Sequence, residues 1–149
     1  MMETPSLAWS VRAICDHADF VSVGANDLMQ FFFASDRDNV RVSDRFDPLH
    51  PASLSMLRFI AQGCNDNNIP VSICGEIAGR PIEAITLVAL GFDALSMPVT
   101  GIGPVKAALL ALDAEKLRDV VVPLITIESR LASVRENVRQ FCMQEGIPV

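Results

Sequence analysis

The sequence predicts an α/β fold in which four short parallel strands alternate with helices over residues 1–112, followed by a helical tail over residues 113–149. Short apolar runs near residues 20, 70 and 94, and a strand that ends at Glu3, supply the four strands. Apolar residues at helical spacing lie between these runs, and strands that alternate with helices in this way pair in parallel. Because a closed eight-stranded barrel typically needs about 250 residues, an open doubly wound sheet fits this length better.

The first half of the chain is expected to hold a helix, a strand and a second helix before a polar loop. Apolar spacing predicts a helix over Leu7–His17, and the β-branched run Phe20–Gly24 predicts a buried strand. Gly24–Asp27 is typical of a turn, Leu28–Ala34 predicts a short apolar helix, and Ser35–Asp47 is expected to be a loop.

The second half repeats this alternation. Pro51 suits the first turn of a helix that ends at Asn65–Asn68. The elements expected after it are a strand over Pro70–Cys74, a helix over Pro81–Leu90, a strand over Ala94–Met97 and a helix over Gly103–Leu112.

The tail is predicted to be helical throughout. Asp113 is typical of a residue that caps a helix start. Spacings of four, three, four, three and four residues separate Ile127, Leu131, Val134, Val138, Phe141 and Glu145, and all of these except Glu145 are apolar. This pattern predicts one long amphipathic helix that packs on the body or on a partner.

Composition and charge exclude some classes of function. The chain is 50% hydrophobic and 20% charged, which indicates one globular domain. Its net charge of −6 argues against binding to nucleic acids or to anionic membranes. Ten of the twelve cations are arginine, which still allows a local anion site. The nearly apolar run Val120–Ile125 is too short to cross a bilayer, so we expect no membrane partner.

The four cysteines indicate neither a metal site nor a disulfide framework. Cys15, Cys64, Cys74 and Cys142 form no C-x-x-C pair and no cluster with histidine. Reduced thiols and a cytoplasmic location are therefore expected.

Polar residues follow three of the predicted strands, at the ends where α/β folds place their active sites. They are Glu3, the segment Gly24–Asp27 and the segment Cys74–Glu76. If the first two strands are neighbours, Glu3 and Asp27 converge, and two carboxylates without histidine or cysteine suit Mg²⁺. The competing interpretation, which is more common, is that Asp27 caps a helix and Glu3 is a solvated strand end.

Cys74, Arg37 and the two histidines also have competing interpretations. The Cys74 thiol could act as a nucleophile or a general acid, or it could be a buried structural cysteine. Arg37 could grip a phosphate or be a charge on a surface loop. His50 is expected to cap the helix that follows it, and His17 to lie on a solvated helix surface.

Together the motifs resemble the phosphoenolpyruvate-utilising enzymes over essentially the whole chain. The run Phe20–Gln30 is similar to their "F-S-x-G-T-N-D-L-T-Q" signature, and Cys74–Gly79 to "C-G-E-M-A-G". The other matching segments are Met2–Ser6, Asp36–Asn39, Asp47–Pro51 and Leu95–Met97. Within the family the chain most resembles the phosphoenolpyruvate–protein phosphotransferases, enzyme I of the phosphotransferase system. The segment after Leu112 is more similar to their nitrogen-regulatory branch.

The resemblance implies a fold and a role for each site residue. The fold would be the C-terminal half of a (β/α)8 TIM barrel, about four βα units, with a helical tail. Glu3 and Asp27 would hold Mg²⁺, and Asn26 and Arg37 would contact the phosphate of phosphoenolpyruvate. Cys74 would protonate the methylene carbon of the enolate, next to a loop shaped by Gly75.

The implied activity is phosphoryl transfer from phosphoenolpyruvate to a protein histidine, with release of pyruvate. The partner would be a histidine phosphocarrier protein. The family's acceptor histidine and further phosphate-binding arginines would lie before Met1, and neither His17 nor His50 has the acceptor motif. The isolated chain is therefore expected to be inactive. Ala25, Met29 and Ile77 depart from the family pattern, and the first two lack a hydroxyl that the family has near the site.

Two other functions stay open. The chain could belong to pyruvate phosphate dikinase, phosphoenolpyruvate synthase or another Mg²⁺-dependent enzyme of pyruvate chemistry, or it could be a non-catalytic dimerisation module. A half barrel would leave strand edges open at Met1–Glu3 and at Ala94–Met97. We therefore expect a homodimer or a larger homo-oligomer.

Overall fold

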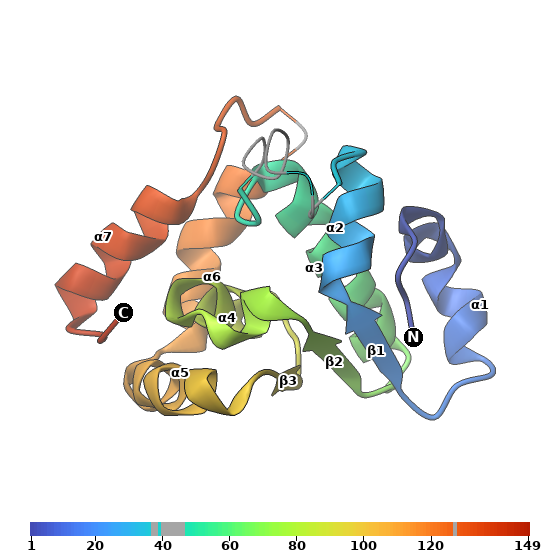
Figure 1. Ribbon diagram of the computed structural model, residues 1–149, viewed down its shortest axis with the longest axis horizontal. Helices are drawn as coiled ribbons and strands as arrows, with labels where there is room; N and C mark the ends of the chain where they lie inside the picture. The colour runs from blue at the N-terminus through green and yellow to red at the C-terminus, as the bar shows by residue number, and fades with distance from the viewer. Residues whose placement is uncertain (37–38, 40–46, 127) are drawn as a thin grey trace.

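The computed structural model describes residues 1–36, 39, 47–126 and 128–149 (Figure 1). Within these residues it confirms an α/β fold with a parallel sheet. The strands are β1 (Val21–Gly24), β2 (Val71–Cys74) and β3 (Ala94–Ser96), paired in the order β1-β2-β3. The helices and 3₁₀ turns are η1 (Pro5–Ser10), α1 (Val11–Cys15), α2 (Ala25–Phe33), α3 (Pro51–Asp66), η3 (Glu76–Gly79), α4 (Pro81–Ala89), α5 (Val99–Ala111), α6 (Ala114–Val121), η4 (Val122–Ile125) and α7 (Arg135–Glu145).

The strand predicted to end at Glu3 is reduced to a single parallel bridge beside β1. Met2 pairs with Val23, its N–H donates to the Ser22 carbonyl at 2.7 Å, and its carbonyl accepts from the Gly24 N–H at 2.9 Å. Including this bridge, strand order follows chain order across the described sheet. A doubly wound sheet reverses its order partway, and the described strands include no such reversal.

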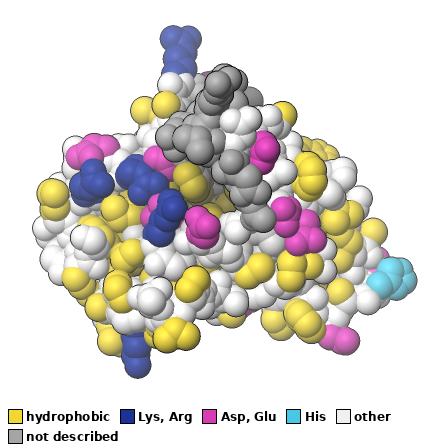
Figure 2. Space-filling model, viewed as in Figure 1, with side chains coloured by type: hydrophobic (Ala, Val, Ile, Leu, Met, Phe, Trp, Pro, Cys, Tyr) yellow, Lys and Arg dark blue, Asp and Glu magenta, His cyan; other side chains and the backbone are white. Residues whose placement is uncertain are grey.

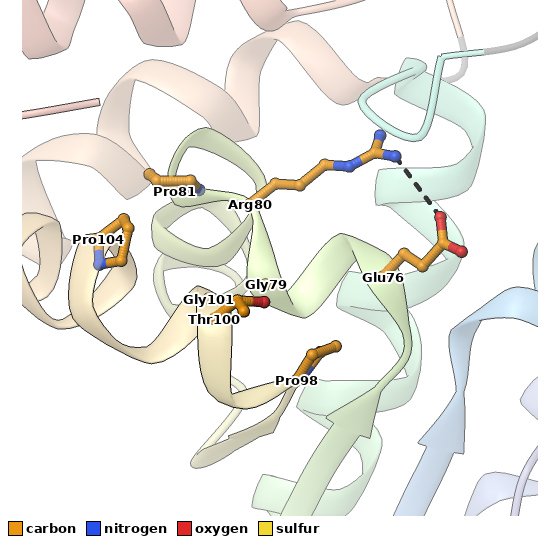
Figure 3. A pocket seen from close by; sticks show the side chains of 8 residues that line it. All are labelled: Glu76, Gly79, Arg80, Pro81, Pro98, Thr100, Gly101 and Pro104. Atoms are coloured by element: carbon orange, nitrogen blue, oxygen red, sulfur yellow. Dashed lines mark ion pairs between the residues drawn. The ribbon is translucent and has the colours of Figure 1, made fainter.

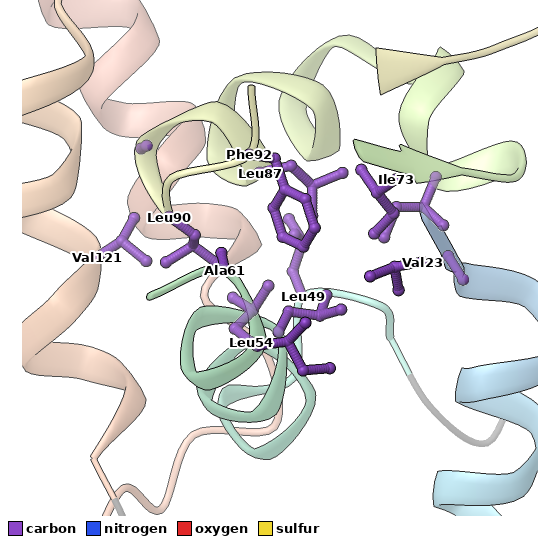
Figure 4. Close-up of a cluster of buried hydrophobic side chains, with 14 of the residues drawn as sticks. Val23, Leu49, Leu54, Ala61, Ile73, Leu87, Leu90, Phe92 and Val121 are labelled. Carbon is purple, nitrogen blue, oxygen red and sulfur yellow. The ribbon is translucent and has the colours of Figure 1, made fainter. Parts of the chain in front are cut away.

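The two faces of the sheet have different surroundings. Successive side chains of a strand point to opposite faces, and Val23 and Ile73 share the face that packs into the main apolar core (Figure 4). There they meet core residues from α3, α4 and the connecting segments, among them Leu49, Leu54 and Leu87. The opposite face carries small side chains: Ser22, Ser72 and Cys74 are half-buried, and Ala94 and Ser96 are exposed.

The helix caps predicted from sequence are confirmed at two positions. Pro51 opens α3, and the Nδ1 atom of His50 accepts a hydrogen bond from the Ala52 N–H at 3.1 Å. At the start of α6, Asp113 Oδ1 accepts from the Lys116 N–H at 3.1 Å. Both caps satisfy N–H groups that the first turn of a helix leaves without a partner.

Two of the early boundaries were predicted wrongly. The helix expected over Leu7–His17 is a 3₁₀ turn, η1, followed by only five residues of α1. The turn expected at Gly24–Asp27 is the beginning of α2, which starts at Ala25. Asp27 is favourable there because a carboxylate in the first turn faces the positive end of the helix dipole.

Helix α5 starts four residues earlier than predicted, at Val99. Its first turn lies against η3, and a Cβ atom on Gly101 would stand 2.9 Å from the Gly79 carbonyl oxygen. This close packing holds a helical turn in a segment that contains two glycines and Pro104, which have low helix propensity.

The tail helix starts later than predicted. Ile127 lies outside the described residues, and α7 begins only at Arg135. Ser133 Oγ accepts from the Arg135 N–H at 3.0 Å, and the Val134 N–H donates to the Leu49 carbonyl at 2.9 Å. These contacts with the body fix where the helix begins. The prediction of one helix from Ile127 is therefore wrong for residues 128–134, which are not helical.

An ion-pair network joins the start of α7 to α4 and to Asp47. Arg135 donates two hydrogen bonds to the Asp47 carboxylate, at 2.8 and 2.7 Å. The same guanidinium donates to Glu83 Oε1 at 2.8 Å, and Glu83 is only 2% exposed. Arg80 also lies 3.9 Å from that oxygen. The network therefore connects segments that are far apart in the chain.

This network predicts a loss of stability in acid. Partial burial raises the pKa of Asp47, but hydrogen bonds from Arg135, the Leu49 N–H and Ser133 outweigh it and lower the pKa from 3.8 to about 2. A carboxyl whose pKa is lower in the folded state stabilises the fold above the unfolded value, and that contribution disappears as the pH falls through the folded value. We expect a contribution of about 2 kcal/mol at neutral pH, lost between about pH 5 and 2.

Urea unfolding of the wild-type chain and of Asp47→Asn at pH 6 and pH 2.5 measures this contribution. The stability difference between the two proteins should shrink by most of those ~2 kcal/mol at the lower pH. A difference that stays constant across this range would show that Asp47 is not held as a carboxylate by Arg135.

Candidate functional site

At the carboxyl ends of the strands, Glu3, Gly24, Cys74 and Ser96 lie level with one another in one row. Gly24 pairs in register with Cys74, and Cys74 with Ser96. Because Met2 pairs with Val23, Glu3 lies level with Gly24 on the next position of the row. The expected convergence of Glu3, the Gly24 segment and the Cys74 segment at one end of the sheet is thus present.

Gly24 leaves room for the Glu3 side chain. A Cβ atom on Gly24 would stand 2.7 Å from Glu3 Cγ and 2.8 Å from Glu3 Oε1. A larger residue at this position would therefore displace the carboxylate. The glycine thus leaves space for the Glu3 side chain over the end of β1.

Cys74 differs from the other three cysteines in its exposure. Its Sγ atom donates to the Val23 carbonyl at 3.5 Å, and its side chain is half-buried on the open face of the sheet. Cys15, Cys64 and Cys142 are buried. Burial, with the neighbouring Cys15, raises the pKa of Cys64 to about 12, and burial raises the pKa of Cys142. Thiols of that kind are poor reagents, and Cys74 is the one cysteine of the four that is not buried.

Asn26 and the Cys74–Glu76 segment lie in contact. The Asn26 Oδ1 atom accepts a hydrogen bond from the Glu76 N–H at 3.4 Å. It also lies 2.8 Å from the position that a Cβ atom on Gly75 would occupy. Gly75 has φ +119° and ψ 177°, a backbone conformation that is essentially restricted to glycine.

Replacing Gly75 by alanine is expected to destabilise the fold by about 1–3 kcal/mol. The methyl group would strain the backbone and push against the Asn26 amide at the same time. Gly103→Ala is the matched control, because no atom lies within 4 Å of a Cβ at that position and its φ is not in the left-handed region. Thermal or urea unfolding of both variants measures the difference. A Gly75→Ala variant as stable as the wild type would show that the Gly75 backbone relaxes without cost.

Of the remaining predicted site residues, the structure describes Asp27 but not Arg37. Asp27 lies in the first turn of α2, three residues after Gly24, and is half-buried. Arg37 lies outside the described residues.

In the part of the chain that is described, no three His, Cys, Asp or Glu side chains gather closely enough to hold a metal ion. Glu3 and Asp27 nevertheless supply two carboxylates at neighbouring strand ends, a donor set that fits Mg²⁺ when water and substrate oxygens complete it.

A pocket of about 290 Å³ lies beside this row (Figure 3). Its lining comes from the segment after β2 and from the start of α5: Glu76, Gly79, Arg80, Pro81, Pro98, Thr100, Gly101 and Pro104. Glu76 and Arg80 form an ion pair at 3.5 Å across its edge. The sequence analysis missed Arg80 and Thr100. Arg80 directly follows the Cys74–Gly79 motif, which is the one signal that could have indicated it.

Figure 2 shows one face of the molecule, on which Lys, Arg, Asp and Glu side chains lie among hydrophobic side chains spread over the surface. Among the described residues, no helix combines the length and the apolar character needed to cross a membrane.

Comparison with known proteins gives one family. Residues 1–114 match the family described as PEP-utilising enzyme, PEP-binding domain. A Salmonella typhimurium protein named phosphoenolpyruvate-dependent phosphotransferase system is 36% identical over 148 residues, which is 99% of this chain and 20% of that protein. A multiphosphoryl transfer protein of Escherichia coli O6:H1 is 39% identical over 120 residues, 80% of this chain and 14% of the relative. The phosphoenolpyruvate-protein phosphotransferase of Mycoplasma genitalium is 32% identical over 147 residues, 99% of this chain and 26% of the relative. The chain thus spans about a fifth of the length of the curated relatives it matches.

Proposed function

Because the chain belongs to the PEP-utilising enzymes and carries their PEP-binding domain, we propose that it forms the carboxyl-side half of a (β/α)8 barrel in a phosphoenolpyruvate–protein phosphotransferase. The whole protein would transfer the phosphoryl group of phosphoenolpyruvate to a protein histidine and release pyruvate. The observation that carries this proposal is the row of Glu3, Gly24 and Cys74 at the carboxyl ends of parallel strands. Barrel enzymes place their chemistry at these ends.

Two features of the sheet support a half barrel. Its strand order follows the chain, as it does when every βα unit is added on the same side. Parallel sheets are normally covered on both faces, yet the face with Ala94 and Ser96 is open. In a barrel this face would be the interior, where side chains from all strands fill the space in layers. The proposed domain boundaries are residues 1–112 for the half barrel and 113–149 for the helical tail.

The proposed chemistry uses the residues of the row. When the phosphorus–oxygen bond of phosphoenolpyruvate breaks and the phosphoryl group passes to a histidine nitrogen, pyruvate is left as its enolate. The Cys74 thiol would then give its proton to the methylene carbon, which completes pyruvate. Asn26 and Arg37 would contact the phosphate. Mg²⁺, held by Glu3 and Asp27, would stabilise the negative charge of phosphate and enolate.

The proposed partner is a histidine phosphocarrier protein, and the proposed location is the cytoplasm. His50 is already engaged, because its Nδ1 caps α3 and its ring lies against Phe33. His50 is therefore not the proposed acceptor histidine. The relatives reported above are named as phosphotransferases and multiphosphoryl transfer proteins, which favours this function over a dikinase, a synthase or a lyase.

A chimaera tests the proposal. The matched segment of the Mycoplasma genitalium relative is replaced by this chain, and labelled phosphoenolpyruvate, Mg²⁺ and a phosphocarrier are added. We expect label on the phosphocarrier with the chimaera and none with the isolated chain. A chimaera that folds, as judged by circular dichroism, but transfers no label while the parent does would contradict the proposed function.

A further inference from the structure

The Asn26 side chain is held by the backbone of the segment that follows β2. Its Oδ1 atom accepts a hydrogen bond from the Glu76 N–H at 3.4 Å. Gly24 and Cys74 are paired in register, and Asn26 and Glu76 each lie two residues further along the chain. The contact therefore joins the segments that follow two neighbouring strands, just beyond the row that carries Cys74.

This hydrogen bond determines which way the Asn26 amide group points. A backbone N–H can only donate, so the atom that faces Glu76 has to be the amide oxygen and not the amide nitrogen. The Nδ2 atom, with its two N–H groups, is then turned away from Glu76. No hydrogen bond joins Nδ2 to any of the described residues. The contact thus leaves two donors of Asn26 for another acceptor.

Gly75 allows the close approach on which this hydrogen bond depends. A Cβ atom at position 75 would stand 2.8 Å from Asn26 Oδ1, so any larger residue would push the amide oxygen away. The Gly75 backbone also has a conformation, with φ +119° and ψ 177°, that is essentially restricted to glycine. Gly75 and the Glu76 N–H therefore act on the amide oxygen as one unit.

The Glu76 side chain takes no part in this contact. Its carboxylate pairs with Arg80 at 3.5 Å, and Figure 3 shows the two side chains meeting at the edge of the pocket. Their exposed fractions are 76% and 55%. The backbone alone holds the Asn26 amide, and every residue except proline would supply the same N–H at position 76.

We propose that the Gly75–Glu76 backbone is a positioning element that turns the N–H groups of Asn26 toward the phosphate of phosphoenolpyruvate. This inference rests on the proposed function, in which Asn26 contacts that phosphate. Phosphate oxygens accept hydrogen bonds, so an amide turned the other way would present its own oxygen to them and repel the phosphate. The segment from Cys74 to Glu76 would then serve both steps, with Cys74 as the proton donor and the next two residues as positioning residues.

Glu76→Pro in the chimaera tests this proposal, because proline has no N–H to donate. Glu76 is the first residue of η3, a position at which proline is tolerated, and circular dichroism checks that the variant folds. Glu76→Ala is the reference, because it removes the same side chain and its ion pair with Arg80 but keeps the N–H. We expect the KM for phosphoenolpyruvate to be about tenfold higher in Glu76→Pro than in Glu76→Ala, the effect of one lost hydrogen bond to a charged group.

A double-mutant cycle with Asn26→Ala shows whether the Glu76 N–H acts through Asn26. If it does, Glu76→Pro should raise the KM little further once Asn26→Ala is present. Exchange of the pyruvate methyl protons with deuterium is a second readout, because pyruvate carries no phosphate. This exchange should run at the same rate in Glu76→Pro and Glu76→Ala, whereas general damage to the Cys74 segment would slow it.

Three results would overturn the positioning role while the proposed function stands. They are an equal KM in Glu76→Pro and Glu76→Ala, effects of Glu76→Pro and Asn26→Ala that multiply in the double variant, and slower methyl-proton exchange in Glu76→Pro than in Glu76→Ala. A chimaera that folds but transfers no label, while its Mycoplasma genitalium parent does, would instead remove the proposed function and the positioning role together.

Discussion

Replacing Arg135 by methionine is expected to lower the free energy of unfolding by about 3–5 kcal/mol. Arg135 is the shared partner of Asp47 and Glu83, at 2.7 and 2.8 Å. The Glu83 side chain is 3% exposed, and without Arg135 its nearest cation in the network would be Arg80 at 3.9 Å. The substitution would thus leave a buried carboxylate with much weaker compensation, which is the costly way to break a buried ion pair. Denaturation with guanidinium chloride measures the loss.

Arg139→Met is the matched control for this effect. Arg139 lies one helical turn further along α7 and pairs with Glu136 at 3.3 Å, with both side chains exposed. Such pairs contribute about 0–1 kcal/mol, so this variant should be nearly as stable as the wild type. Adding Glu83→Gln to Arg135→Met should recover part of the stability, because the buried charge is then removed. A loss below about 1 kcal/mol for Arg135→Met would mean that Glu83 is compensated by other groups.

No feature of the sequence indicated this network. Asp47 and Arg135 are 88 residues apart, and Glu83 lies in an apolar helix where the spacing pattern gives no reason for a carboxylate. Ion pairs between distant segments depend on how the helices pack, and a single sequence does not encode that packing locally. The late start of α7 could not be predicted for the same reason, because contacts to Leu49 and Asp47 set it.

Local signals, in contrast, were sufficient for the strands and for two caps. Val71–Cys74 and Ala94–Ser96 lie within the runs that the sequence predicted, since β-branched and apolar residues between turn-forming residues favour strands. Asp113 and His50 act as caps because their side chains can accept a hydrogen bond within the first turn of their own helix. These interactions need no information from elsewhere in the chain.

The row of the candidate site was predictable in part. Once strands pair in parallel, their carboxyl ends meet at one edge, and this brings Glu3, Gly24 and Cys74 level. The contact between Asn26 and Gly75 was not predictable, because it depends on α2 beginning at Ala25 rather than after a turn. The roles of Glu3, Asn26, Asp27, Arg37 and Cys74 stay predictions, and Arg37 lies outside the described residues.

Replacing Cys74 by alanine in the chimaera is expected to slow pyruvate formation by about 10²–10⁴-fold, the usual contribution of a positioned general acid. The Cys74 side chain is half-buried on the open face of β2 and donates to the Val23 carbonyl, so its loss removes a proton donor without leaving a buried charge. Binding of phosphoenolpyruvate should change little, because the residues proposed to hold Mg²⁺ and phosphate are untouched.

Ser72→Ala is the matched control, because Ser72 lies two residues earlier on the same face of the same strand. Exchange of the pyruvate methyl protons with deuterium, followed by NMR, separates the proton step from phosphoryl transfer, since exchange needs the group that moves the proton to and from carbon. The Cys74→Ala chimaera should lose this exchange, and the Ser72→Ala chimaera should keep it. Exchange at the parental rate in Cys74→Ala would assign the proton transfer to another group and leave the thiol with a packing role.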